Sequence, residues 1–292
     1  MNGGRVPQGY TEQRVQVGDV GINYVRGGRG DPLVLLHGYP QTWYMWRKVL
    51  PELARHYTVV APDLRGAGGS DAPPDGYDKK TLADDVHGLL AQLDLDGDLR
   101  VVGHDIGTMV AYAYAAEHGD DVRKLVLTEA PIPDGSLFRI PSLTPDGPGF
   151  WNLGFFSLPN GLPEEIVDGR EELWVDRFTD SMEVQDGISA DDVREYARHL
   201  KDSAHLRASF EYFRALPQDI ADNSEYTRTK LTMPVLALGA RASLGESVPD
   251  QVRQYATMVS GDVIEDSGHW IFEEQPAELT DRLLHFLGAP TG

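Results

Sequence analysis

The segment at residues 99–119, LRVVGHDIGTMVAYAYAAEHG, constrains the fold of this chain more than any other. Leu99–Val102 is apolar and rich in β-branched residues, and an alanine-rich stretch follows Gly107, so the pattern predicts a strand that leads directly into a helix. Gly103 and Gly107 each stand two residues from Asp105. Glycines at this spacing are typical of a sharp strand-to-helix turn that exposes its central side chain. The segment therefore predicts an α/β fold in which Asp105 is presented at the end of a strand.

Short β-branched runs alternate with helical segments along much of the chain, which is typical of a largely parallel sheet flanked by helices. The predicted strands are Arg14–Val17, Gly21–Val25, Leu33–His37, Thr58–Pro62, Arg100–Gly103, Lys124–Thr128, Val235–Leu238 and Asp262–Glu265. The predicted helices of this part are Thr42–His56, Lys80–Leu93, Thr108–His118 and Ala277–Leu287. Gly18 and Asp19 separate the first two strands, so the sheet is expected to begin with an antiparallel hairpin.

Residues 133–217 interrupt this alternation. They begin with a stretch rich in Pro and Gly, and then become helical. The helices predicted here are Pro163–Phe178, Ala190–Lys201 and His205–Ala215. We therefore expect a core of two parts, residues 1–132 and 218–292, with residues 133–217 inserted as a helical cap that excludes water from the side chains near Asp105.

Composition limits the class of partner. The net charge is −20 and the pI is near 4.7, which disfavours nucleic acids and anionic membranes. The absence of cysteine excludes disulfides, thiolate metal sites and cysteine nucleophiles. The first residues contain no apolar segment typical of a signal peptide, and no run approaches the ~20 apolar residues of a membrane-spanning helix, so we expect a cytoplasmic protein. We expect a small apolar substrate and no cofactor or metal, with a homodimer as one possible assembly.

An aspartate at the exposed turn favours attack on saturated carbon. A carboxylate is already ionised near neutral pH and needs no base to activate it. Its attack on an sp3 carbon leaves an ester that water can cleave, whereas a serine there would leave an ether. Asp105 therefore predicts displacement at saturated carbon, as in epoxide opening or carbon–halogen cleavage, followed by ester hydrolysis.

Ester hydrolysis needs a base, and His269 is the best candidate because it follows the last strand and completes the chain order of nucleophile, acid and histidine. An acid must then orient the histidine. Glu129 directly ends the sixth strand, where an unpartnered carboxylate would be costly to bury. Glu246, the first acid after the seventh strand, is the alternative.

The tetrahedral intermediate needs hydrogen-bond donors for its oxyanion. The backbone N–H of Ile106, directly after the nucleophile, is one candidate. The N–H of Tyr39 is the other, because Pro40 has none. His37 and His104 are expected to support loop backbones rather than to take part in the chemistry.

These residues together resemble the Asp-nucleophile branch of the α/β-hydrolase superfamily, which contains epoxide hydrolases and dehalogenases. The resemblance covers nearly the whole chain. The motifs that carry it are HGYP at 37–40, DLRGAGGSDAP at 63–73, GHDIG at 103–107, EAPIPD at 129–134 and GHW at 268–270. Within the branch, GHDIG, EAPIPD and FEYFRAL (210–216) resemble bacterial epoxide hydrolases that draw the acid from after the sixth strand, which favours Glu129.

The predicted cap departs from that subgroup. The resemblance implies a tyrosine immediately before the Arg-Ala of FEYFRAL, to donate to the epoxide oxygen, but this chain has Phe213. Tyr212 is adjacent, although one helical residue turns a side chain by about 100°. Asn152 stands where the subgroup has a histidine. Tyr212 and Asn152 are therefore the candidates for assisting ring opening.

Dehalogenases resemble the chain less well. Haloalkane dehalogenases carry a tryptophan after the nucleophile, and fluoroacetate dehalogenases carry arginines there and three residues later, where this chain has Ile106 and Met109. Trp151 remains a candidate indole donor to a halide. The more economical interpretation of the aromatic residues is an apolar substrate pocket. The residues expected to bind substrate are Trp151, Asn152, Phe155, Phe210, Tyr212 and Phe213.

We therefore expect an epoxide hydrolase that opens a bulky apolar epoxide through an ester on Asp105, which water activated by His269 then hydrolyses. The alternatives are a haloalkane or haloacid dehalogenase, and a natural-product tailoring enzyme that acts on an activated epoxide. A non-catalytic binding module is disfavoured, because it would not need Asp105, Glu129 and His269 together.

Overall fold

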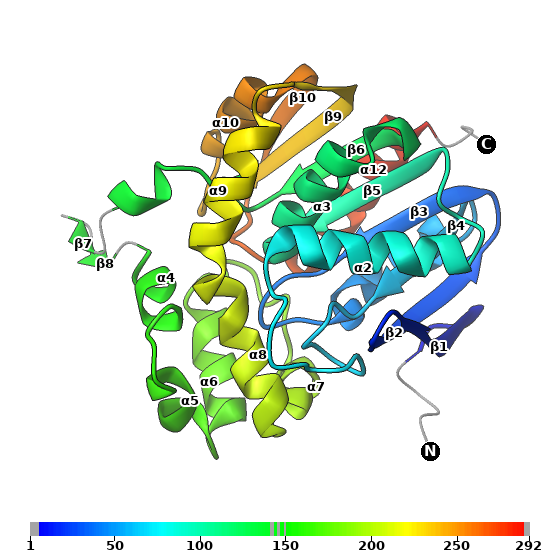
Figure 1. Ribbon diagram of the computed structural model, residues 1–292. Helices are drawn as coiled ribbons and strands as arrows, with labels where there is room; N and C mark the ends of the chain where they lie inside the picture. The colour runs from blue at the N-terminus through cyan, green and yellow to red at the C-terminus, as the bar shows by residue number, and fades with distance from the viewer. Residues whose placement is uncertain (1–5, 141–142, 145–146, 149, 289–292) are drawn as a thin grey trace.

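A computed structural model describes residues 6–140, 143–144, 147–148 and 150–288 (Figure 1). Eight strands form one sheet in the order β1-β2-β4-β3-β5-β6-β9-β10. They are β1 (Tyr10–Val17), β2 (Val20–Gly28), β3 (Asp31–Leu36), β4 (Tyr57–Pro62), β5 (Leu99–His104), β6 (Val122–Thr128), β9 (Leu231–Ala240) and β10 (Ala256–Ile264). β1 and β2 form the predicted hairpin, β2 is antiparallel to β4, and the other pairs are parallel. The predicted eight-stranded, mostly parallel sheet is confirmed.

Helices cover both faces of the sheet, and all six residues of the central strand β5 are therefore buried. α2 (Lys79–Gln92) and α3 (Ile106–Glu117) cover the face that is in front in Figure 1, and α12 (Pro276–Leu287) lies behind the sheet. Shorter helices complete the core: η1 (Trp43–Lys48), α1 (Leu50–Leu53), η2 (Gly119–Asp121), α10 (Ser247–Tyr255) and α11 (Ile271–Glu274). Asp78 caps α2 by accepting the N–H of Thr81 at 2.9 Å.

Residues 133–230 form an inserted segment between β6 and β9. It contains η3 (Leu137–Arg139), α4 (Trp151–Phe156), α5 (Leu162–Val167), α6 (Glu171–Asp180), α7 (Ala190–Leu200), α8 (Ser203–Arg214) and α9 (Leu216–Tyr226), with a small hairpin of β7 (Leu143–Thr144) and β8 (Gly147–Pro148). In Figure 1, α4 to α8 gather beside one end of the sheet, and α9 leads back to it. The inserted segment is thus a helical layer built onto one end of the sheet.

Several predicted bounds of helices and strands were wrong. The expected helix 42–56 is instead η1 followed by the short α1. The expected helix 163–178 is divided into α5 and α6 at a loop that contains Gly169, whose φ is +72°. The last strand is β10, which begins six residues before the predicted Asp262. The cap boundary at residue 217, which stays a prediction, lies in the first turn of α9.

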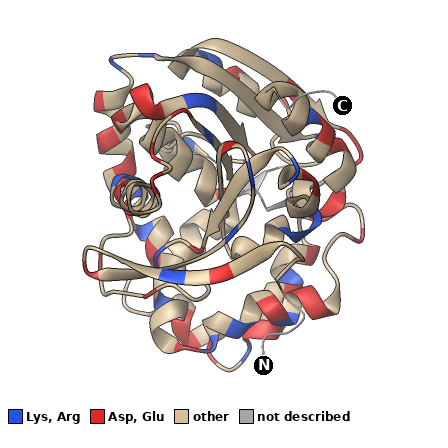
Figure 2. Cartoon of the chain, turned by 90° about the vertical axis from the view of Figure 1, so that its right-hand side faces the viewer, with Lys and Arg blue, Asp and Glu red and all other residues tan. Residues whose placement is uncertain are grey.

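Acidic residues are spread over the outer helices and loops, with Lys and Arg interspersed among them (Figure 2). Over the described residues, no helix combines the length and the apolar character that crossing a bilayer requires.

Candidate active site

The predicted functional residues meet at the carboxyl ends of adjacent parallel strands. Asp105 follows β5 and Glu129 follows β6, its neighbour in the sheet. Tyr39 lies in the loop after β3, on the other side of β5, and His269 lies in the loop after β10. Because the strands are parallel, all four residues come to the same edge of the sheet, where α/β proteins place their ligands.

The turn at Asp105 explains the two glycines around it. Asp105 has a φ of +53°, and its N–H donates to the Thr128 carbonyl at 3.1 Å. A Cβ on Gly107 would lie 1.9 Å from the carbonyl oxygen of Leu36, and one on Gly103 would lie 2.3 Å from that of Gly107. The helix can therefore begin directly against the sheet only with glycine at both positions, and the turn points Asp105 outward.

Asp105, His269 and Glu129 form a contiguous triad. His269 Nδ1 lies 3.0 Å from Glu129 Oε2, and its Nε2 lies 3.6 Å from Asp105 Oδ2. The other oxygen of Glu129 accepts the N–H of Ala240 at 2.6 Å, so both oxygens of this fully buried carboxylate have partners. Glu246, the alternative acid, is exposed at the start of α10. The geometry therefore favours Glu129 as the orienting acid.

The charges of the triad are strongly coupled. Burial lowers the pKa of His269, but hydrogen bonds to Asp105 and Glu129 and the charges of both carboxylates raise it to about 10. Burial alone would raise the pKa of Asp105, yet the hydrogen bond and charge of His269 bring it below its ordinary value. In the resting site, His269 is therefore an imidazolium between two carboxylates.

Two backbone donors point at the nucleophile. The N–H of Tyr39 donates to Asp105 Oδ1 at 2.8 Å, and a hydrogen bond from the N–H of Ile106 lowers the pKa of the same carboxyl. A Cβ on Gly38 would lie 2.3 Å from Asp105 Oδ1, so glycine there lets the loop approach. The two donors expected from the sequence thus lie against the carboxyl group at which an ester would form.

The two other histidines near the site differ from each other. His37 supports loop backbone as expected: Nε2 accepts the N–H of Leu64 at 3.0 Å, and Nδ1 lies 3.0 Å from the Gly38 carbonyl. His104 instead contacts the hydroxyl of Thr128 at 3.2 Å, and its ring lies 4.9 Å from that of His269. Burial, with the nearby charge of His269, lowers the pKa of His104 to about 3, so it is neutral in the folded protein.

A cavity of about 420 Å³ opens above the triad. Asp105, His269, Glu129 and Tyr39 line it from the core. Trp151, Asn152 and Phe213 line it from the inserted segment, as expected. Its other apolar walls include Met109, Leu137, Phe178, Met182, Leu216 and Leu244. Among the described residues that line the cavity, none is Lys or Arg, so the site suits an uncharged, apolar ligand.

Three residues expected to bind substrate do not line this cavity. Tyr212 points away from it, and its hydroxyl donates to the backbone carbonyl of Arg65. Phe210 is fully buried against Phe156, with ring centroids 5.4 Å apart, and Phe155 packs on Trp174 at 5.5 Å. The expectation was therefore wrong for these three. The side chain of Tyr212 lies on the face of α8 that packs against the core, and Phe155 and Phe210 pack into a cluster of aromatic side chains with Phe156 and Trp174.

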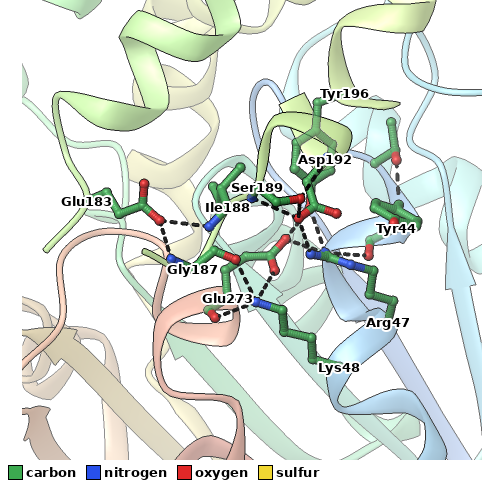
Figure 3. A network of polar contacts seen from close by, with 11 residues as sticks. Tyr44, Arg47, Lys48, Glu183, Gly187, Ile188, Ser189, Asp192, Tyr196 and Glu273 are labelled. Carbon is green, nitrogen blue, oxygen red and sulfur yellow. Dashed lines mark hydrogen bonds and ion pairs between the residues drawn. The ribbon is translucent and has the colours of Figure 1, made fainter. Parts of the chain in front are cut away.

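A buried polar network joins the inserted segment to the chain just after His269 (Figure 3). Glu273 on α11 forms an ion pair with Arg47 of η1 and accepts a hydrogen bond from the hydroxyl of Tyr196 on α7. Arg47 also pairs with Asp192 on α7 at 2.9 Å. The carboxylate of Glu273 is fully buried, so its partners are required to offset its desolvation. Sequence reasoning missed this network, which fixes α11 and α7 against η1.

Glu274 supports the loop that carries His269. The backbone N–H groups that donate to its carboxylate, at 2.8 to 3.1 Å, are those of Gly268, Trp270, Val184 and Gln185. His269 itself donates its N–H to the carbonyl of Met182 at 2.9 Å. The loop that carries His269 is thus fixed between α11 and the loop after α6. Two adjacent acids, Glu273 and Glu274, in an apolar context are the sequence signal that could have revealed both contacts.

Among the residues that the structure describes, one group of side chains has metal-ligand chemistry, and none of its members lines the cavity. Ligand atoms of His87, His118 and Asp121 all lie within 4.8 Å of one another. The two imidazole rings stack in parallel with centroids 3.9 Å apart, so their in-plane lone pairs do not converge on one point. This group is therefore separate from the chemistry of the triad.

Comparison with known proteins identifies the family of the chain. The family described as the alpha/beta hydrolase fold matches residues 31–276. The chain belongs to this family. It is 34% identical over 282 residues to the soluble epoxide hydrolase of Corynebacterium sp. (strain C12), covering 94% of this chain and 96% of the relative.

Two further comparisons concern a dehalogenase and an epoxide hydrolase. The chain is 34% identical over 215 residues to the fluoroacetate dehalogenase of a Burkholderia species, covering 71% of this chain and 70% of the relative. The crystal structure of the Cif epoxide hydrolase from Acinetobacter nosocomialis superposes with a TM-score of 0.92 at 26% identity, over 97% of this chain and 90% of that one. The protein is a hydrolase of this family.

Proposed function

We propose that this α/β hydrolase is an epoxide hydrolase that opens a bulky apolar epoxide through an alkyl ester on Asp105. The observation that carries the proposal is an ionised carboxylate facing an apolar cavity, with a histidine–glutamate pair beside it. The similarity to a soluble epoxide hydrolase over 94% of the chain supports the same reaction.

The triad suits a reaction in two steps. In the first, an oxygen of Asp105 attacks an epoxide carbon, the carbon–oxygen bond breaks, and the electron pair stays on the epoxide oxygen. The ester that forms is uncharged, so the influence of Asp105 that raised the pKa of His269 disappears while burial continues to lower it. His269 then releases its proton to solvent and becomes a base at the stage when a base is needed, and it takes up a proton from solvent again once the charge of Asp105 is restored.

In the second step, water adds to the ester carbonyl carbon. His269 accepts a proton from that water through Nε2, while Glu129 keeps Nδ1 protonated and in place. The N–H groups of Tyr39 and Ile106 stabilise the oxyanion. Collapse of the intermediate releases the diol and restores Asp105.

We also propose that the inserted segment, including the predicted cap 133–217, acts as a cap over this site. Trp151, Asn152 and Phe213 belong to it and line the same cavity as Asp105. A wall of this kind reduces the entry of water into the cavity and strengthens the electrostatic interactions inside it. Asn152 remains a candidate for contacting the substrate oxygen.

A haloalkane dehalogenase is the second candidate, favoured by Trp151 in the cavity wall and by the fluoroacetate dehalogenase relative. A haloacid suits the cavity poorly, because the described lining residues offer its carboxylate no Lys or Arg, and the charge of His269 is already paired with Asp105 and Glu129. Ile106 and Met109, which stand where fluoroacetate dehalogenases carry arginines, are apolar and buried, so they offer no charge to a haloacid.

Intact-protein mass spectrometry of His269→Gln, incubated with a panel of epoxides and haloalkanes, tests the proposal. Loss of the base should leave the ester trapped on Asp105. An added mass equal to the whole epoxide supports epoxide opening, and an added mass equal to the haloalkane minus hydrogen halide supports the dehalogenase. The control His269→Gln/Asp105→Asn should gain no mass. Absence of any adduct would contradict the proposed nucleophile.

A further inference from the structure

Opening an epoxide places negative charge on the ring oxygen, and an acidic donor in the cavity lowers that barrier. The resemblance implies a tyrosine at the position where this chain has Phe213. The adjacent Tyr212 donates its hydroxyl hydrogen bond to the backbone carbonyl of Arg65 instead. The imidazolium protons of His269 face Asp105 and Glu129. The proposed reaction therefore leaves its oxygen without an assigned acid.

The hydroxyl of Tyr39 is the candidate for this donor. Burial raises the pKa of this phenol, and the hydrogen bond from Trp174 lowers it in part. Tyr39 lines the cavity together with Asp105, and it is 3% exposed. Its phenol oxygen accepts the indole N–H of Trp174 at 2.7 Å. Within the described parts of the chain, the hydroxyl proton itself finds no acceptor, in contrast to that of Ser181, which donates to the carbonyl of Phe178 at 2.8 Å. The described residues thus leave the proton of Tyr39, a residue of the cavity wall, without a protein acceptor.

The ring of Tyr39 is fixed in this position. It contacts Phe156 at 4.9 Å, and Phe178 and Phe213 each at 5.4 Å between ring centroids. The contact with Phe213 is edge to face, so Tyr39 supplies a phenol from the core next to the residue where the resemblance implies one. Its backbone N–H donates to Asp105 Oδ1, which ties the phenol and the nucleophile to one residue. A donor that is fixed before the reaction needs no reorganisation when charge develops.

We propose that Tyr39 is the acid that protonates the epoxide oxygen, with Trp174 as a positioning residue that donates a hydrogen bond to the phenolate. This inference rests on the proposed function. As Asp105 bonds to carbon, the carbon–oxygen bond breaks and the leaving oxygen takes the proton of Tyr39. Water then cleaves the ester. One of its two protons reaches the second product hydroxyl through His269, and the other restores the hydroxyl of Tyr39.

The side chain and the backbone of Tyr39 thus serve different steps, and this separation makes the proposal testable. In the His269→Gln background, Tyr39→Phe should slow formation of the epoxide adduct by about 100-fold, within the range of general acid catalysis. Trp174→Phe should slow it by about tenfold. Tyr77→Phe is the matched control, because it removes a buried hydroxyl that donates to Pro73 at 2.7 Å outside the cavity, and it should leave the rate unchanged.

A second measurement excludes indirect damage to the site. With His269 intact, Tyr39→Phe should turn over slowly without accumulating ester, because only alkylation is impaired. Accumulation of ester would show that the backbone donor to the oxyanion had been disturbed instead, and would overturn the proposal. An unchanged alkylation rate in Tyr39→Phe, or a large loss in Tyr212→Phe alone, would also overturn it. Absence of an adduct with Tyr39 intact would refute the proposed function itself, so the two failures are distinguishable.

Discussion

Neutralising Asp105 should convert His269 from an acid into a base, and Asp105→Asn imitates that change without a substrate. In the folded protein the pKa of His269 is raised to about 10, against burial, by hydrogen bonds and charges of Asp105 and Glu129. The substitution removes the charge of Asp105 and keeps its shape. Glu129 and the burial of the ring are unchanged.

The magnitude follows from the geometry. His269 Nε2 and Asp105 Oδ2 lie 3.6 Å apart. At an effective dielectric constant of about 20, two unit charges at this separation interact by about 4.6 kcal/mol. Since about 1.4 kcal/mol corresponds to a tenfold change in an equilibrium constant, the titration midpoint of His269 should move toward acid by about three pH units. The histidine of Asp105→Asn therefore titrates near neutral pH.

The assay is an NMR titration of protein labelled at histidine ring carbons, from pH 5 to 11, with the His269 signal assigned by its loss in His269→Gln. Asp121→Asn, which removes a charge from η2 beyond the opposite end of β6, is the control and should leave the midpoint in place. A midpoint in Asp105→Asn within half a pH unit of the wild-type value would refute the reasoning, because the ester would then not release the base.

Three further outcomes are expected. Glu129→Gln should lower kcat by on the order of 10³- to 10⁴-fold, because the amide no longer fixes the imidazole tautomer; steady-state assays on a substrate found by adduct formation measure this, and a loss below tenfold would contradict it. Glu274→Gln should lower the free energy of unfolding by about 2 to 3 kcal/mol in urea titrations, because its amide N–H₂ faces backbone donors, whereas the exposed Glu265→Gln should leave it nearly unchanged. Burial keeps the pKa of His104 and that of His199 at about 3, so between about pH 6.5 and 3 the unfolded chain binds protons that the folded chain does not, and stability should fall as pH falls; urea unfolding of His104→Asn should show a shallower dependence than the wild type.

Local sequence was sufficient to predict the elements that carry the chemistry. The GHDIG turn predicted the position of Asp105, because a Cβ on the glycines around it would clash with nearby backbone, as one on Gly103 would with the carbonyl of Gly107. The order of strands with Glu129 and His269 at their ends predicted a common sheet edge, because parallel neighbours end together. Local patterns failed where short elements depend on their neighbours, as at α5, α6 and β10.

The cavity wall was predicted less well than the triad. Tyr212 and Phe213 are adjacent in sequence and both are buried, yet one bonds to Arg65 and the other lines the cavity. The direction in which each side chain points depends on how α8 rotates against the core, and that rotation is set by packing against residues more than 100 positions away. No pattern within α8 encodes it.

The sequence by itself determined the position of Asp105, its turn and the chain order of Asp105, Glu129 and His269, because these depend on backbone geometry over short distances and on chain order in a parallel sheet. Only the tertiary structure decided which polar groups have hydrogen-bond partners and which charges are coupled. Glu274 and Tyr39 acquire their roles from contacts with Gly268 and Trp174, which are near in space through folding, and the coupled charges of His269 arise from two carboxylates that the sheet brings together. Electrostatic and hydrogen-bond energies depend on distances of a few ångströms, and the folded chain alone sets those distances.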